Sequence, residues 1–232
     1  MKKPLPSSFR GRPFSSREAI AAGVGERRLR SPELHRPFHG VRIVLAETIT
    51  PWQRIRAYQR WMPATQYFSH TTAAIIHGMP LPLSHECSPL VHVGALPGAG
   101  LPRANGVVGH RPREQKRLVE RAGCRVTSAV DTWCDLATML DLDDLIAIGD
   151  FLITGDEPYS GRPPIATLPE LADAVARRAG KRGIRLLKTA LKQLRYGSMS
   201  RMIYVAADDV LKRASETLHR IRARLRARGA AI

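Results

Sequence analysis

The order of local signals in the first 45 residues constrains the fold more than any other feature of this chain. Ser15 to Glu18 reads Ser-Ser-Arg-Glu, a capping-box pattern that satisfies the free N–H groups at the start of a helix. The predicted helix ends at Gly23, and an arginine-bearing helix is expected from Gly25 to Leu34. Pro37 and Gly40 then punctuate residues 35–45, and Val41, Ile43 and Leu45 occupy alternate positions, as in a strand of a β-hairpin. Helix, glycine turn, helix and hairpin is the order of a winged helix-turn-helix.

Charge is distributed unevenly along the 232 residues, whose formal net charge is +17. Residues 1–45 carry a net +7, residues 46–176 a net −3, and residues 177–232 a net +13. Basic ends around a slightly acidic body point to a polyanionic partner such as nucleic acid. Residues 131–173 hold ten acidic side chains and one arginine, so this acidic stretch is also a candidate docking surface for a basic protein.

Composition narrows the class of protein. An apolar content of 44% is that of a globular chain. No apolar run approaches the roughly 20 residues that span a bilayer, and no signal core follows the first residues. We therefore expect a cytoplasmic protein without a membrane partner. The three cysteines, Cys87, Cys124 and Cys134, form no Cys-x-x-Cys pair and are expected to be buried thiols.

The remaining sequence predicts an α+β protein with an α-rich mixed body and short strands. Helices are expected over residues 51–61, 69–78, 128–139, 142–153, 168–178 and 183–195, and strands over 90–95 and 106–110. The resulting domains are a flexible basic arm (1–13), a winged helix-turn-helix (14–48), an α/β body (49–196) and a basic C-terminal helical tail (197–232).

The C-terminal tail predicts an amphipathic helix from Ala206 to Arg228. Apolar side chains recur at steps of three and four, at Leu211, Ala214, Leu218, Ile221 and Leu225. Two heptads are too few for a coiled coil. The stripe therefore either packs on the body or forms the interface of a homodimer.

Basic side chains of the N-terminal segment are the candidate contacts to double-stranded DNA. In a winged helix the second helix enters the major groove, where arginine pairs with guanine. We assign Arg27, Arg28 and Arg30 to base edges or phosphates. From the wing, backbone or minor-groove contacts are expected of Arg36, His39 and Arg42. Arg10 and Arg12 would form a minor-groove arm. The alternative is a solvated surface on a small helical lid.

No constellation of catalytic or metal-binding residues is legible in the sequence. His70 and His77 share a helix face without the His-x-x-x-His step of a zinc protease. His92 and His110 lie on predicted strands without a spacing that indicates a site. Glu114 and Lys116 form a Glu-x-Lys triplet that lacks a nearby upstream acid. We therefore expect a protein that is not an enzyme, without a metal or other cofactor.

Four segments together resemble a known family. They are GRPFSSREAIAAGVGERRLRSPELHRPFHGVR from Gly11, FSHTTAAIIHGMPLP from Phe68, VTSAVDTWCDLATMLDLDDLIAIGDFLI from Val126 and GKRGIRLLKTAL from Gly180. Their order is similar to that of the abortive-infection type IV (AbiE-type) antitoxins and transcriptional regulators. The resemblance implies a winged helix-turn-helix that binds operator DNA and represses its own operon. It also implies a domain, from Phe68 to Leu194, that antagonises a nucleotidyltransferase-type toxin.

The resemblance ends near residue 196. Many relatives look as though they continue, after a Gly-Ser-x-Ser stretch, into a domain like the very-short-patch-repair endonuclease. Here Gly197 to Ser200 is followed by Ile203 where those relatives place a Glu, so that domain is expected to be absent. Two alternatives to a DNA-binding regulator therefore remain: a truncated endonuclease relative that only binds DNA, and a protein-interaction module.

Overall fold

The structure is a computed structural model that describes residues 5–9, 12–38, 40–44, 49–112, 115–155 and 163–194. It divides the chain into two compact units. Unit 1 consists of Met1–Phe68 and Ser88–Gln115, and unit 2 of Ser69–Cys87 and Lys116–Ile232. Arg10, His39, Glu114 and the whole predicted tail, with its dimerisation stripe, lie outside the described residues.

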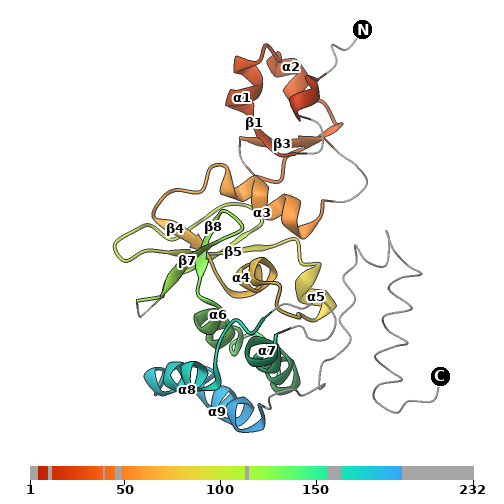
Figure 1. Cartoon of the computed structure of the whole chain (residues 1–232). Helices are drawn as coiled ribbons and strands as arrows, with labels where there is room; N and C mark the ends of the chain where they lie inside the picture. Colours follow the sequence, from red (N-terminus) through yellow and green to blue (C-terminus); the bar gives the residue numbers. More distant parts are fainter. Residues whose placement is uncertain are drawn as a thin grey trace, which may run out of the picture. The chain divides into compact units, whose positions relative to one another are not determined.

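The N-terminal part of unit 1 is a small α/β layer built from five elements. A 3₁₀ turn precedes them, and in chain order they are β1 (Phe14–Ser15), α1 (Ser16–Ala21), α2 (Glu26–Leu29), β2 (Leu34–His35) and β3 (Val41–Val44). Both β1 and β2 pair antiparallel with β3, so the strand order is β1-β3-β2. Helices α1 and α2 lie on the same side of this sheet (Figure 1).

The start of α1 confirms the predicted capping box. Ser15 Oγ accepts a hydrogen bond from the Glu18 amide at 3.0 Å, and the Glu18 carboxylate accepts one from the Ser15 amide at 2.7 Å. The second helix is shorter than expected, because α2 is a single turn that ends at Leu29. The pattern that we extended to Leu34 instead becomes a turn and strand β2.

This N-terminal part has its own apolar core. The core joins the sheet, both helices and the preceding turn through Leu5, Phe9, Phe14, Ala19, Val24, Leu29 and Leu34. Phe9 stacks on Phe14 with ring centroids 4.6 Å apart. The expectation of a flexible arm over residues 1–13 is therefore wrong for Leu5 to Phe9, whose apolar side chains fix the segment in the core.

The rest of unit 1 consists of a helix and three strands. They are α3 (Pro51–Gln59), β4 (Gln66–Phe68), β5 (Val91–Ala95) and β6 (Val107–His110). Strand β5 pairs antiparallel with β4 and parallel with β6. Helix α3 begins at Pro51, as predicted, and is capped by Thr50, whose hydroxyl accepts a hydrogen bond from the Gln53 amide at 3.2 Å.

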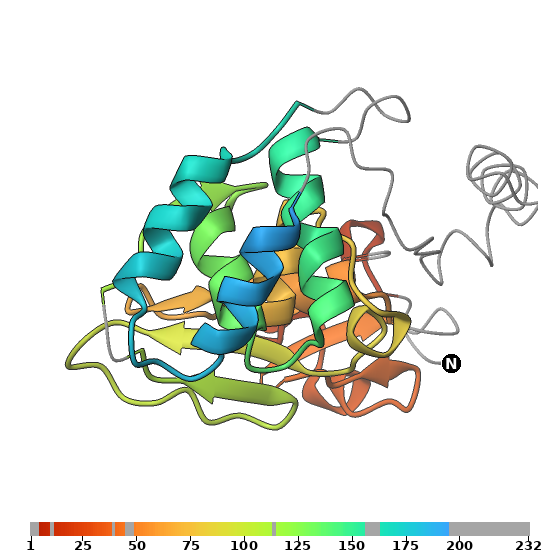
Figure 2. The ribbon, with the colours of Figure 1, turned by 90° about the horizontal axis from the view of Figure 1, so that it is seen from below.

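Unit 2 is mainly helical. Its elements are α4 (His70–His77), α5 (Leu83–Glu86), the antiparallel hairpin β7 (Leu118–Arg121) and β8 (Cys124–Thr127), α6 (Ala129–Leu136), α7 (Leu142–Thr154), α8 (Leu168–Arg177) and α9 (Ile184–Gln193). Figure 2 shows α6 to α9, coloured green to blue, lying side by side. Trp133 of α6 is fully buried among them, and its indole N–H donates to the Leu145 carbonyl at 2.9 Å.

The mixed α and β content that the sequence predicts is confirmed. Within the described residues, no helix is long and apolar enough to cross a membrane.

Candidate nucleic-acid interface

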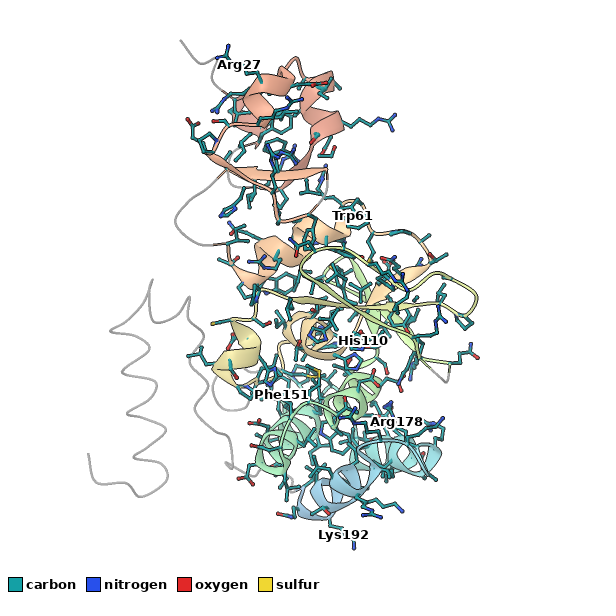
Figure 3. The ribbon with its side chains drawn as sticks, turned by 180° about the vertical axis from the view of Figure 1, so that it is seen from behind. Arg27, Trp61, His110, Phe151, Arg178 and Lys192 are labelled. Atoms are coloured by element: carbon teal, nitrogen blue, oxygen red, sulfur yellow. The ribbon has the colours of Figure 1, made fainter. Side chains whose placement is uncertain are left out.

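Two of the three predicted α2 arginines face solvent. Arg27 is exposed and projects outward from α2 (Figure 3), and its guanidinium contacts no described residue through a hydrogen bond or ion pair. Arg30 pairs with Glu26 one turn earlier at 3.2 Å, with both side chains 73% exposed. So exposed a pair contributes little to stability, and Arg30 can exchange Glu26 for a phosphate or a base edge at small cost.

Unlike Arg27 and Arg30, Arg28 is largely shielded from solvent. Its guanidinium is only 17% exposed and donates through Nη2 to Glu33 at 2.8 Å. The Nε and Nη1 atoms are buried and have no hydrogen-bond partner among the described residues. Arg28 therefore belongs to the packing of this layer, and contact with a DNA base would require it to leave its buried position.

Of the two described wing arginines, only Arg36 is exposed. Arg42 on β3 donates from Nε to the Leu29 carbonyl at 3.0 Å and from Nη1 to the Val41 carbonyl at 2.9 Å. Burial, together with the positive charge of Arg36, lowers the pKa of Arg42. Because Leu29 ends α2, Arg42 caps the last turn of that helix, and its side chain is already committed to the fold.

Arg12 lies on a groove of unit 1 that sequence reasoning missed. The groove has a volume of about 850 Å³ and is lined by Arg12, Pro13, Ser15, Glu18, Trp52, Gln53, Arg56, Gln59 and Arg60. One wall comes from the segment that enters α1, and the other is α3 and the residue after it. Since the two walls are about 40 residues apart, no sequence motif joins them.

Glu18 connects the two walls of this groove. Its Oε1 atom pairs with Arg60 and lies 3.7 Å from Nη1 of Arg12. Burial raises the pKa of Glu18, but the hydrogen bonds from Ser15 and the charge of Arg60 lower it more, so the pKa falls below the ordinary 4.5. Glu18 is therefore ionised at neutral pH and holds two arginines at the groove.

An aromatic side chain accompanies these charges. Trp52 on α3 remains 38% exposed, and the Arg56 guanidinium lies over its ring, 5.7 Å from the centroid. Arg56 also donates from Nη1 to Gln59 at 2.9 Å. Alternating cations and an exposed indole in one groove are the groups that bind phosphate and stack on a nucleic-acid base.

A pair of histidines in unit 1 is also brought together without a sequence signal. His92 on β5 and His110 on β6 stack with ring centroids 5.1 Å apart, and Nδ1 of His92 lies 2.9 Å from Nε2 of His110. Gly94 pairs with His110 in the parallel register, which places the two histidines diagonally on one sheet face. Two imidazole nitrogens at this separation form a hydrogen bond. Imidazole nitrogens are also common ligands of transition metals.

Part of the acidic stretch of unit 2 is buried inside the fold. Asp135, Asp144 and Asp150 are buried. Asp131 accepts a hydrogen bond from the Arg117 amide at 2.9 Å, and Asp141 caps α7 by accepting one from the Asp144 amide at 2.9 Å. Asp135, Asp144 and Asp150 are therefore withdrawn from a docking surface for a basic protein, whereas Asp141, Asp143 and Asp173 stay exposed on it.

Comparison with known proteins leaves the family open. No protein-family model matches the chain, and no curated protein matches it. The likeness to the AbiE-type antitoxins therefore stays a prediction from the four quoted sequence segments.

Proposed function

We propose that this chain is a non-enzymatic DNA-binding transcriptional regulator of the type IV antitoxin kind, which represses its own operon. The observation that carries the proposal is the presentation of Arg27, Arg30 and Arg36 on the outside of a small α/β layer with its own core. Element order β1-α1-α2-β2-β3 and strand order β1-β3-β2 support it, because a winged helix-turn-helix has the same arrangement after its first helix.

Recognition in this proposal begins with α2 in the major groove. Arg27 and Arg30 reach base edges, where a guanidinium donates two hydrogen bonds to the O6 and N7 atoms of guanine. Arg36 contacts a backbone phosphate from the loop between β2 and β3. Because α2 is a single turn, it offers few side chains to the bases, and phosphate contacts supply much of the affinity.

The remaining parts of the proposal concern the partners. Operator DNA is a cytoplasmic ligand, so the regulator works in the cytoplasm. Unit 2 antagonises a nucleotidyltransferase-type toxin encoded beside it, and a twofold operator would be read by a homodimer. A nucleotidyltransferase-like reading frame next to this one supports the antitoxin role, and its absence leaves a regulator without a toxin.

Selection of duplexes from a random pool tests the DNA-binding function. The full chain is expected to enrich one sequence and to bind it at least about a thousandfold more tightly than a scrambled duplex. The logarithm of the affinity should fall linearly with log salt, through counterion release at several phosphates. Failure to enrich any sequence, or cleavage of the duplex in Mg²⁺ or Mn²⁺, would overturn the proposal, and cleavage would favour the endonuclease alternative.

A further inference from the structure

The groove between the α1 entry segment and α3 in unit 1 has the size and chemistry of a small-ligand site. Its volume of about 850 Å³ lies within the roughly 300–1,000 Å³ of typical ligand pockets. The proposed duplex contacts at Arg27, Arg30 and Arg36 are not among its lining residues. The groove is therefore a second site, whose occupant must be identified from its own chemistry.

Charge in the groove selects an anion. Arg12, Arg56 and Arg60 bring three positive charges, and Glu18 brings one negative charge. The net value of about +2 matches a phosphate monoester, which carries about −1.5 to −2 at pH 7. A guanidinium also fits phosphate geometrically, because it donates parallel hydrogen bonds to two oxygens.

Trp52 adds selectivity for a flat, aromatic group. The Trp52 indole is 38% exposed, so part of its ring is available for contact with a ligand. Arg56 covers one face of the ring through a cation–π contact. Stacking of a nucleobase on the remaining surface would complete an arginine–indole–base sandwich, and such stacking does not depend on which base is present.

We propose that this groove binds a nucleotide unit, with its phosphate between Arg12, Arg56 and Arg60 and its base stacked on Trp52. The unit is either a free nucleoside monophosphate or one nucleotide of a single-stranded nucleic acid. Both present a base and a phosphate, a monoester in the free nucleotide and a singly charged diester in the strand. This inference does not depend on the proposed duplex-binding function, because the two use different side chains.

Glu18 regulates access to the phosphate site. In the unliganded groove its carboxylate pairs with Arg60 and approaches Arg12, so the incoming phosphate must compete with it for both cations. Replacement by glutamine removes the charge. Glutamine also serves at position N3 of a capping box, where Glu18 stands, so the start of α1 is kept. Glu18→Gln is thus expected to bind the anion about two- to fivefold more tightly.

Calorimetric titration of the full chain tests the site with defined probes. Adenosine 5′-monophosphate is expected to bind. Adenosine lacks the phosphate and ribose 5-phosphate lacks the base, so each is expected to bind at least about tenfold more weakly. A ten-nucleotide single-stranded oligonucleotide distinguishes the sources. Tighter binding of the oligonucleotide than of the monophosphate identifies a strand, and the reverse identifies a free nucleotide.

Matched variants connect the binding to this groove. Trp52→Ala is expected to weaken binding about 10- to 100-fold, and Arg60→Ala about tenfold. Trp61→Ala removes an equally exposed indole that does not line the groove, and should leave the affinity unchanged. All variants keep Arg27, Arg30 and Arg36. Duplex binding that stays unchanged in a variant therefore shows that unit 1 is folded. Duplex binding of the unsubstituted chain tests the function proposed above, separately from the groove.

Two results would overturn the inference. One is that neither the monophosphate nor the oligonucleotide binds the full chain at millimolar concentration. The other is that Trp52→Ala and Trp61→Ala weaken binding equally, which would place the ligand elsewhere. Glu18→Gln adds a test of direction: release of Arg12 and Arg60 is expected to tighten binding of the anion, whereas damage to the fold of unit 1 would weaken it.

Discussion

Arg178 Nη2 donates a hydrogen bond of 2.7 Å to Oδ1 of Asp135, a carboxylate only 5% exposed within unit 2. Lys116 Nζ donates to the same oxygen at 2.7 Å. Figure 3 shows Arg178 on the helical part of unit 2. Two cations on one buried carboxylate tie the end of α8 and the segment before β7 to α6. Removal of the carboxylate would leave both cations buried together.

Asp135→Asn is therefore expected to lower the free energy of unfolding by about 3–5 kcal/mol. Denaturant unfolding followed by far-ultraviolet circular dichroism measures the change. Asp143→Asn is the matched control, because Asp143 is exposed in the first turn of α7 and contributes less than about 1 kcal/mol there. Equal effects of the two variants would show that the buried cluster contributes no more than an exposed charge.

His110 makes stability depend on acid pH. Burial lowers the pKa of His110 from 6.5 to about 4. Between pH 4 and 6.5 the unfolded chain therefore binds more protons at this residue than the folded chain. Stability rises with pH across this window, and it is lost as the pH falls from 6.5 towards 4.

We expect the His110 contribution to amount to about 2–3 kcal/mol across that window. His110→Gln should flatten the dependence of unfolding free energy on pH between 4 and 6.5. His35→Gln is the control, since His35 is exposed on β2. An unchanged slope in His110→Gln would contradict the role of His110, because the dependence would then come from other groups, among them His77, whose pKa burial also lowers.

The thiols differ in reactivity. Cys124 and Cys134 are buried as predicted, but Cys87 is exposed, because it follows the short surface helix α5. Burial also raises the pKa of Cys134 to about 12. A thiol reagent is expected to label one cysteine in the native chain and three after denaturation. Mass spectrometry should place the native label on Cys87, and fast native labelling of Cys134 would contradict its burial.

Arg42 distinguishes a structural arginine from a DNA contact. Its two hydrogen bonds to backbone carbonyls predict that Arg42→Gln lowers the unfolding free energy by about 1–3 kcal/mol. The folded fraction should bind duplex DNA with an unchanged salt slope. A slope reduced by about one would instead show that Arg42 neutralises a phosphate, as the sequence first suggested.

The positions of most long helices could be predicted from the sequence, because the signals that start a helix lie in neighbouring residues. The capping box at Ser15 and Glu18 and the cap at Thr50 are such cases. The β7–β8 hairpin was missed because its turn is Ala122-Gly123, with both residues at positive φ. An Asn-Gly pair at the same place would have been recognised, whereas alanine carries no signal for that conformation.

The site was less predictable than the fold. Exposure of Arg27 and burial of Arg28 follow from how the one-turn helix α2 packs, and adjacent arginines look alike in sequence. The groove requires Glu18 to meet Arg60 across 42 residues, and the histidine pair requires the parallel register of β5 and β6. Such long-range contacts are set by tertiary packing, which a single sequence does not display.

The most direct test of the regulator is the specificity ratio of two matched double variants, measured as affinity for the selected duplex over a scrambled one. Arg27→Ala/Arg30→Ala removes two positive charges from α2, and Arg185→Ala/Lys188→Ala removes two exposed ones from α9. We predict that the α2 variant loses at least about tenfold in the ratio while the α9 variant keeps it. Equal ratios in the two variants would contradict sequence recognition by α2.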